Sequence, residues 1–106
     1  MKYAIASSGD TLKDELDKRF GRCRFVVIID TQTKSVEFFP NPYMDIDKDA
    51  GLNLIRLLDE KGVRKIVSGS FGEKIKDLLD NKKIQMIIPG ASDSSVADII
   101  EMINSG

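Results

Sequence analysis

A single cysteine set among arginines is the feature of this sequence that most directly suggests chemistry. Cys23 ends the run Lys18-Arg19-Phe20-Gly21-Arg22-Cys23 and is followed by Arg24. Nearby cations favour the thiolate, which is the form of cysteine that ligates metals and reacts. Guanidinium groups also bind phosphates, carboxylates and anionic clusters. The alternative is a solvated basic turn with a small apolar cysteine directed into the core, since free cysteine is among the most buried residue types.

The chain offers few other metal ligands. It has one cysteine and no histidine, whereas structural zinc needs four protein ligands and iron–sulfur clusters usually need four thiolates. Cys23 is therefore the expected metal ligand only as one corner of a preformed cluster, alone or together with the cysteine of a second subunit. Weaker thioether candidates are Met44, Met86 and Met102.

Three turns rich in small residues suggest a second kind of chemistry, the binding of anions by backbone amides. They are Ser7-Ser8-Gly9, Gly69-Ser70-Phe71-Gly72 and Gly90-Ala91-Ser92. Each follows a predicted strand, and two lead directly into helices, whose N-terminal N–H groups and dipoles favour anions. If the strands are parallel, their carboxyl ends bring the three turns to one edge of a sheet. The alternative is three ordinary turns that use glycine and serine as caps.

Other motifs that carry chemistry are missing from the sequence. Carboxylates alternate at Asp45, Asp47 and Asp49, but a calcium loop starting at Asp45 would need glycine and glutamate where this chain has Ala50 and Arg56. The sequence also contains no phosphate-binding P-loop, no C-x-x-C and no G-x-S-x-G motif. The residues alone therefore indicate no enzyme.

Composition limits the class of protein. The 106 residues have room for one hydrophobic core, so we expect a single domain over residues 1–106. A net charge of −1 lacks the basic excess of nucleic-acid-binding proteins. No apolar run approaches the roughly 20 residues of a membrane helix. We expect a cytoplasmic protein that binds neither nucleic acid nor membrane, as a monomer or weak homodimer.

The elements that must position these residues follow from hydrophobic patterning. Strands are predicted over 3–6, 25–30, 35–40, 64–68 and 84–89, and helices over 50–61, 73–81 and after residue 93. The second and third strands are predicted to form an antiparallel hairpin across a polar turn. The later strand–helix–strand units should cross over right-handed and lie parallel.

Several ends and caps can also be predicted. A short exposed helix or turn is expected over 11–20, which Gly21 ends. Gly62 should adopt a left-handed C-terminal cap after the helix over 50–61. The N-caps expected are Asp49 for that helix, and Ser92 or Asp93 for the last helix.

Strings spread over the whole chain resemble the dinitrogenase iron–molybdenum cofactor biosynthesis family. Its members include nitrogenase cofactor carriers and the C-terminal domain of the radical enzyme that assembles the cofactor. The most specific of these strings is Arg19-Phe20-Gly21-Arg22. The others are Met1-Lys2-Tyr3-Ala4-Ile5-Ala6-Ser7, Asn41-Pro42, Ala50-Gly51, Gly69-Ser70-Phe71-Gly72 and Pro89-Gly90-Ala91-Ser92.

The resemblance implies a three-layer, ribonuclease H-like α/β fold. Its five-stranded mixed sheet has the order 3-2-1-4-5, with strand 2 antiparallel to the rest and helices on both faces. The resemblance also implies a non-catalytic module that binds or carries an iron–sulfur or iron–molybdenum cluster, or its precursor. The partners expected are proteins that donate or accept the cluster. Cofactor-carrying relatives are thought to use histidine as well as cysteine, and this chain departs from them because it has no histidine.

The cluster-binding residues expected from the motifs and the resemblance together lie in the arginine–cysteine run and in the three turns. They are Cys23, which is also the expected metal ligand, Arg19, Arg22, Arg24, Ser7, Ser8, Gly69, Ser70, Gly72, Gly90, Ala91 and Ser92.

Two alternative functions remain open. One is a ligand-free scaffold that docks partners through the charged stretch over 11–18. The other is a metal-dependent, nuclease-like enzyme on the same fold, which would need several carboxylates converging on divalent metal. The strand over 3–6 contains no acidic residue, and Asp10 and Asp30 lie at or beyond strand ends. This second alternative therefore rests on analogy of fold alone.

Overall fold

The computed structural model describes residues 1–90 and 94–105, and within them the elements follow the predicted order β, β, β, α, β, α, β, α. The strands are β1 (Lys2–Ser7), β2 (Phe25–Asp30), β3 (Ser35–Pro40), β4 (Val63–Val67) and β5 (Gln85–Ile87). The helices are α1 (Ala50–Glu60), α2 (Glu73–Asn81) and α3 (Val96–Ser105). No helix among these residues is both long and apolar enough to cross a membrane.

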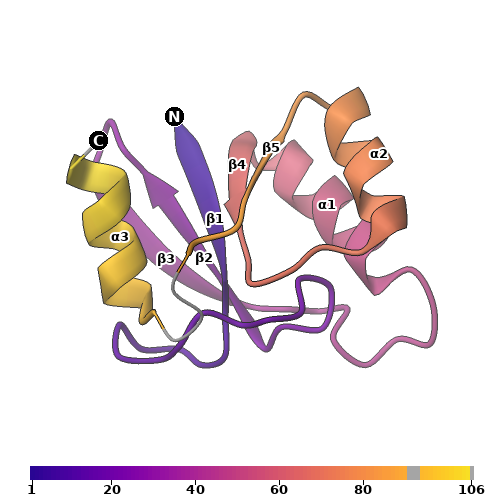
Figure 1. Ribbon diagram of the computed structural model, residues 1–106, viewed down its shortest axis with the longest axis horizontal. Coiled ribbons are helices and arrows are strands. Elements are labelled where there is room, and N and C mark those ends of the chain that lie inside the picture. The colour runs from indigo at the N-terminus through magenta and orange to yellow at the C-terminus, as the bar shows by residue number, and fades with distance from the viewer. Residues whose placement is uncertain (91–93, 106) are drawn as a thin grey trace.

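The five strands form one mixed sheet in the order β3-β2-β1-β4-β5. β2 pairs antiparallel with both β1 and β3, while β1 pairs parallel with β4 and β4 pairs parallel with β5. Helices α1 and α2 cover one face of this sheet and α3 covers the other (Figure 1). This arrangement confirms the predicted three-layer α/β fold, including the antiparallel second strand.

Two apolar clusters, one on each face of the sheet, hold the layers together. Ala4 and Ala6 of β1 belong to the cluster beneath α1 and α2, whereas Ile5 belongs to the cluster beneath α3. β2 alternates in the same way, with Val26 in the first cluster and Val27 in the second. Because both faces of the sheet are covered, these strands are continuously apolar rather than alternating.

The ends of the elements differ in part from the predictions. Gly62 has φ +84°, which confirms the left-handed cap after α1. Asp49 occupies the N-cap position of α1, but its side chain makes no capping hydrogen bond. Ser95 begins α3 through a capping box: its hydroxyl accepts from the Asp98 N–H, and the Asp98 carboxylate accepts from the Ser95 N–H, both at 3.1 Å. The two residues predicted for this role, Ser92 and Asp93, lie outside the described residues.

The segment over 11–20 forms turns and isolated bridges and contains no helix. Leu16 is buried in the cluster beneath α3, whereas Phe20 is buried in the cluster beneath α1 and α2. A single helix could not direct these two side chains to opposite faces of the sheet, so tertiary packing overrides the helical spacing. The Asp14 carboxylate also accepts hydrogen bonds from the Thr11 N–H and hydroxyl, both at 2.8 Å, which closes a local turn.

Candidate functional site

A cleft of about 720 Å³ lies where the beginnings of α1 and α2 meet residues 19–22. Apolar and small residues share its lining with six charged side chains, among which cations outnumber carboxylates; the charged residues are Arg19, Arg22, Lys48, Lys74, Asp49 and Glu73. The N-cap positions of both helices, Asp49 and Gly72, make no side-chain capping hydrogen bond. The first N–H groups of each helix therefore add to the positive potential in the cleft.

Glycines bring the walls of the cleft close together. A Cβ on Gly21 would lie 2.6 Å from the backbone nitrogen of Gly51 and 2.8 Å from its Cα. A Cβ on Gly51 would in turn lie 2.3 Å from Cδ1 of Ile75 in α2. Residues 19–22 thus pack against the start of α1 at a distance that only glycine permits. This contact brings the Arg19-Phe20-Gly21-Arg22 and Ala50-Gly51 strings together in space.

The turn between β4 and α2 is fastened to the irregular segment before Phe20. The Gly69 N–H donates to the Asp17 carbonyl at 2.9 Å, and the Ser70 hydroxyl donates to the Lys18 carbonyl. A Cβ on Gly69 would lie 2.8 Å from Cα of Lys18. Ser70 and Gly72 line the cleft, whereas Gly69 does not. The turn is thus both a structural anchor and one wall of the cleft.

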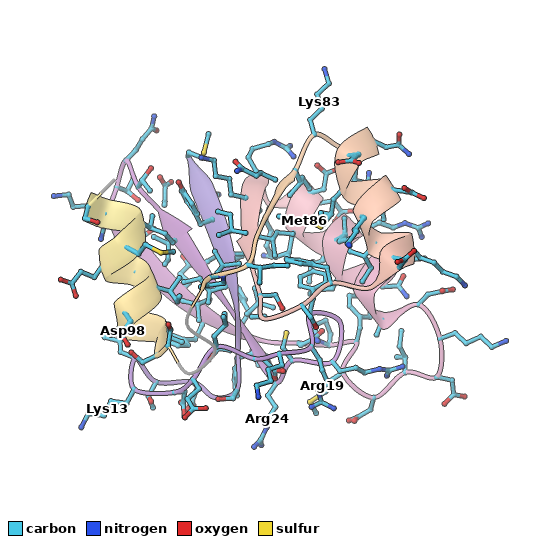
Figure 2. The ribbon with its side chains drawn as sticks, viewed as in Figure 1. Lys13, Arg19, Arg24, Lys83, Met86 and Asp98 are labelled. Atoms are coloured by element: carbon cyan, nitrogen blue, oxygen red, sulfur yellow. The ribbon has the colours of Figure 1, made fainter. Side chains whose placement is uncertain are left out.

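The three predicted arginines have different surroundings. Arg19 lines the cleft with a side chain that is 70% exposed, and its only ion pair among the described residues is a long 3.8 Å contact to Asp17. Arg22 also lines the cleft, but its guanidinium donates to backbone carbonyls of the loop before α1. Arg24 is exposed and is not part of the lining; Figure 2 shows it projecting into solvent. The cleft therefore leaves Arg19 as the arginine whose charge is available to a ligand.

Cys23 lies in the core and not in the cleft. Its side chain is fully buried in the cluster beneath α1 and α2, and its sulfur lies 3.8 Å from the side-chain nitrogen of Asn41. Burial, reinforced by the nearby charge of Asp17, raises the pKa of the thiol to about 12. Cys23 is thus a neutral thiol in the core and not a thiolate beside arginines. This is the alternative given above, a small apolar cysteine directed into the core. Among the described residues, no group of three or more histidine, cysteine or acidic side chains could hold a metal ion.

The thiol is expected to be inert in the folded protein. Because only the thiolate attacks disulfide reagents, Cys23 should react with Ellman's reagent at least about 100-fold more slowly in the native state than in guanidinium chloride. The measurement is the release of thionitrobenzoate at about pH 8. Equal rates in the two states would show an accessible thiolate and contradict the burial.

The remaining predicted residues lie away from the cleft or outside the described part of the chain. Ser7 is buried, and its hydroxyl donates to the Gly9 carbonyl at 2.7 Å. The Ser8 N–H donates to the backbone carbonyl of Glu15 at 3.0 Å. Neither serine lines the cleft, and neither does Gly90. Ala91 and Ser92 are outside the described residues. The structure thus brings together Arg19, Arg22, Ser70 and Gly72 of the predicted set.

Two lysines of the cleft were missed by the motif analysis. Lys48 lies just before α1, and Lys74 lies in the first turn of α2. Their positions next to two predicted helix N-termini were the available signal. Neither belongs to a recognisable motif, and only the packing of α1 beside α2 brings the two helix beginnings into one cleft.

Comparison with known proteins places the chain among relatives of the same fold. The model of the family described as dinitrogenase iron–molybdenum cofactor matches residues 1–106. The apo form of the orange protein from Desulfovibrio gigas is 23% identical, with a TM-score of 0.86 over 99% of this chain and 88% of that one. A putative NifB protein from Thermotoga is 24% identical, with a TM-score of 0.82 over 99% of this chain and 88% of that one. None of the curated proteins compared matches the chain.

Proposed function

This chain belongs to the dinitrogenase iron–molybdenum cofactor family, and from that premise we propose that its cleft binds an anionic iron–sulfur or iron–molybdenum cluster, or a precursor of one, as cargo. The observation that carries the proposal is the cleft itself, where Arg19, Lys48 and Lys74 surround two helix N-termini without side-chain caps. Cations and oriented N–H groups are the features that bind anions. The role is non-catalytic, and the partners are the proteins that supply or receive the cluster.

The chemistry of the cleft determines how such cargo would bind. Its lining contains no thiol and no imidazole, because Cys23 is buried and the chain has no histidine. A cluster held here would therefore keep its own sulfide or organic ligands and interact through charge and hydrogen bonds. Binding of this kind should weaken as salt rises, since exposed charges are screened over about 8 Å at physiological ionic strength.

We expect the purified protein to bind a synthetic [4Fe–4S] cluster that carries thiolate ligands and a net double negative charge. The measurement is iron per chain after anaerobic gel filtration, together with a binding titration followed by visible absorption. Arg19→Ala with Lys74→Ala should weaken binding about tenfold, because each exposed charge contact contributes up to about 1 kcal/mol.

The matched control removes the same charge elsewhere. Lys13 and Arg24 are exposed, lie outside the cleft and project from the lower edge of the molecule as drawn (Figure 2). Lys13→Ala with Arg24→Ala should therefore leave binding within about twofold of the original protein. If the original protein retains no cluster at low salt, or if the two double variants bind equally, the proposed function is wrong.

A further inference from the structure

The guanidinium of Arg22 is committed to the main chain of the loop that precedes α1. Its Nη1 donates to the carbonyl oxygens of Met44, at 2.9 Å, and Ile46, and its Nη2 lies 3.4 Å from the carbonyl oxygen of Asp47. These carbonyls belong to the protein, so the Nη1 hydrogens that could bind an anion are already used. Arg22 therefore differs from Arg19, although both line the cleft.

Asn41 fastens the beginning of the same loop. Its side-chain amide donates to the carbonyl oxygens of Gly21 and Cys23, each at 2.9 Å, and its side-chain oxygen accepts from the Tyr43 N–H at 3.0 Å. The loop is thus held at its start by Asn41 and further along by Arg22. Both anchors involve residues 21–23. The two cleft-lining residues Lys48 and Asp49 follow directly after the second anchor.

The part of the loop that enters the cleft is held from the α1 side at Asp49, whose carbonyl accepts from the N–H and the side-chain amide of Asn53, each at 3.0 Å. Lys48 and Asp49 are exposed, and Asp49 adopts φ +61°, a left-handed conformation that is uncommon for residues other than glycine. Such conformations persist where the surrounding structure fixes them. The carbonyls that Arg22 holds are the nearest fixed points before Lys48 in the chain.

We propose that Arg22 is a positioning residue of the cleft: by clamping the carbonyls of residues 44, 46 and 47, it sets Lys48 and the first N–H groups of α1 to face an anion, without contacting that anion itself. This inference rests on the proposed function and deepens it. It divides the cationic lining into side chains that contact the cargo, Arg19, Lys48 and Lys74, and one that prepares the site.

Replacing the planar guanidinium should show the difference. A lysine keeps the charge but cannot span several carbonyls with a rigid fork of donors. We expect Arg22→Lys and Arg22→Ala to weaken binding of the synthetic dianionic [4Fe–4S] cluster equally, by about tenfold. Amide hydrogen exchange over residues 44–49 should become faster in both variants. If Arg22→Lys keeps the original affinity, Arg22 contacts the anion directly and the inference is wrong.

A double-mutant cycle tests whether Arg22 acts through Lys48. In a Lys48→Ala background, Arg22→Ala should cost clearly less affinity than in the original protein, whereas in a Lys74→Ala background it should keep its full effect. Equal costs in both backgrounds would overturn the inference. So would lower thermal stability of Arg22→Ala with unchanged affinity, which is the result of a purely structural role. If the original protein does not bind the cluster, the proposed function is wrong. If the original protein binds the cluster but the cycle shows no coupling between Arg22 and Lys48, only the inference about Arg22 is wrong.

Discussion

Gly21→Ala is expected to destabilise the fold by about 3 kcal/mol, although it adds a single methyl group. The new Cβ would lie 2.6 Å from the backbone nitrogen of Gly51 and 3.2 Å from the carbonyl carbon of Ala50. These atoms belong to the first turn of α1 and cannot rotate away as a side chain can. Relief requires α1 to move away from residues 19–22. Chemical denaturation in urea, analysed for the free energy of unfolding, measures the cost.

Two other glycines supply graded controls. A Cβ on Gly51 would meet the end of the Ile75 side chain, which can change rotamer, and alanine also favours the helix by about 1 kcal/mol. Gly51→Ala should therefore cost less than Gly21→Ala. A Cβ on Gly90 would meet nothing within 4 Å, so Gly90→Ala should be close to neutral. Equal stability of the three variants would contradict the close packing of Gly21 against α1.

The fold was largely predictable because its strongest signals are local. The continuous apolar run of β2 and the polar turn after it predicted a buried strand and a hairpin, and the register pairs Phe25 with Pro40 and Asp30 with Ser35. The helix α1 and its glycine cap were predictable in the same way. The order of the strands came from the family resemblance, because local patterns do not specify which strands become neighbours.

The segment over 11–20 was not predictable from its spacing. Leu12, Leu16 and Phe20 recur with a helical period, yet Leu12 stays exposed while Leu16 and Phe20 enter opposite cores. Their destinations depend on how the chain crosses the carboxyl end of β1. One isolated bridge pairs Leu16 with Ser7, and another pairs Glu15 with Ser95, about 80 residues away in the sequence. These long-range contacts, rather than local spacing, decide that path.

The candidate site was predicted in part, for a physical reason. Proximity in sequence suggested that the arginines surround Cys23, but the chain turns over residues 20–23, where the Cys23 N–H donates to the Phe20 carbonyl at 3.4 Å, so consecutive side chains point in different directions. Cys23 faces the core, Arg24 faces solvent and Arg22 reaches the loop before α1. Lys48 and Lys74 joined the site only through packing of the two helices. The turn that leads into α2 and the two arginines were predicted as parts of the site, whereas the beginning of α1 and the two lysines were not.

Cys23 should make the stability of this protein depend on alkaline pH. Burial raises the pKa of its thiol from 9.0 to about 12 in the folded state. Between these values the unfolded chain releases the thiol proton while the folded protein retains it, so the free energy of unfolding falls as pH rises. The stability contributed by the protonated thiol is fully present below about pH 9 and is lost as pH rises toward about 12. Each pH unit in this window costs about 1.4 kcal/mol.

Comparison with Cys23→Ala isolates this effect from lysine and tyrosine titration. The variant should be less stable than the original protein by about 1–2 kcal/mol near neutral pH, because it leaves a small cavity. That cost does not depend on pH, whereas the ionisation penalty exists only in the original protein. Urea unfolding at about pH 8 and about pH 10.5 should therefore show the gap shrinking by about 2 kcal/mol and changing sign near the upper value.

A gap that stays constant with pH would mean that the folded protein ionises Cys23 as easily as the unfolded chain does. The thiolate would then be available in the native state, and Cys23 would regain the role of metal ligand that its buried position denies. A shrinking gap instead ties the neutral thiol to the core. Ligands for any cluster in the cleft would then have to come with the cluster, because the cleft lining contains no thiol or imidazole of its own.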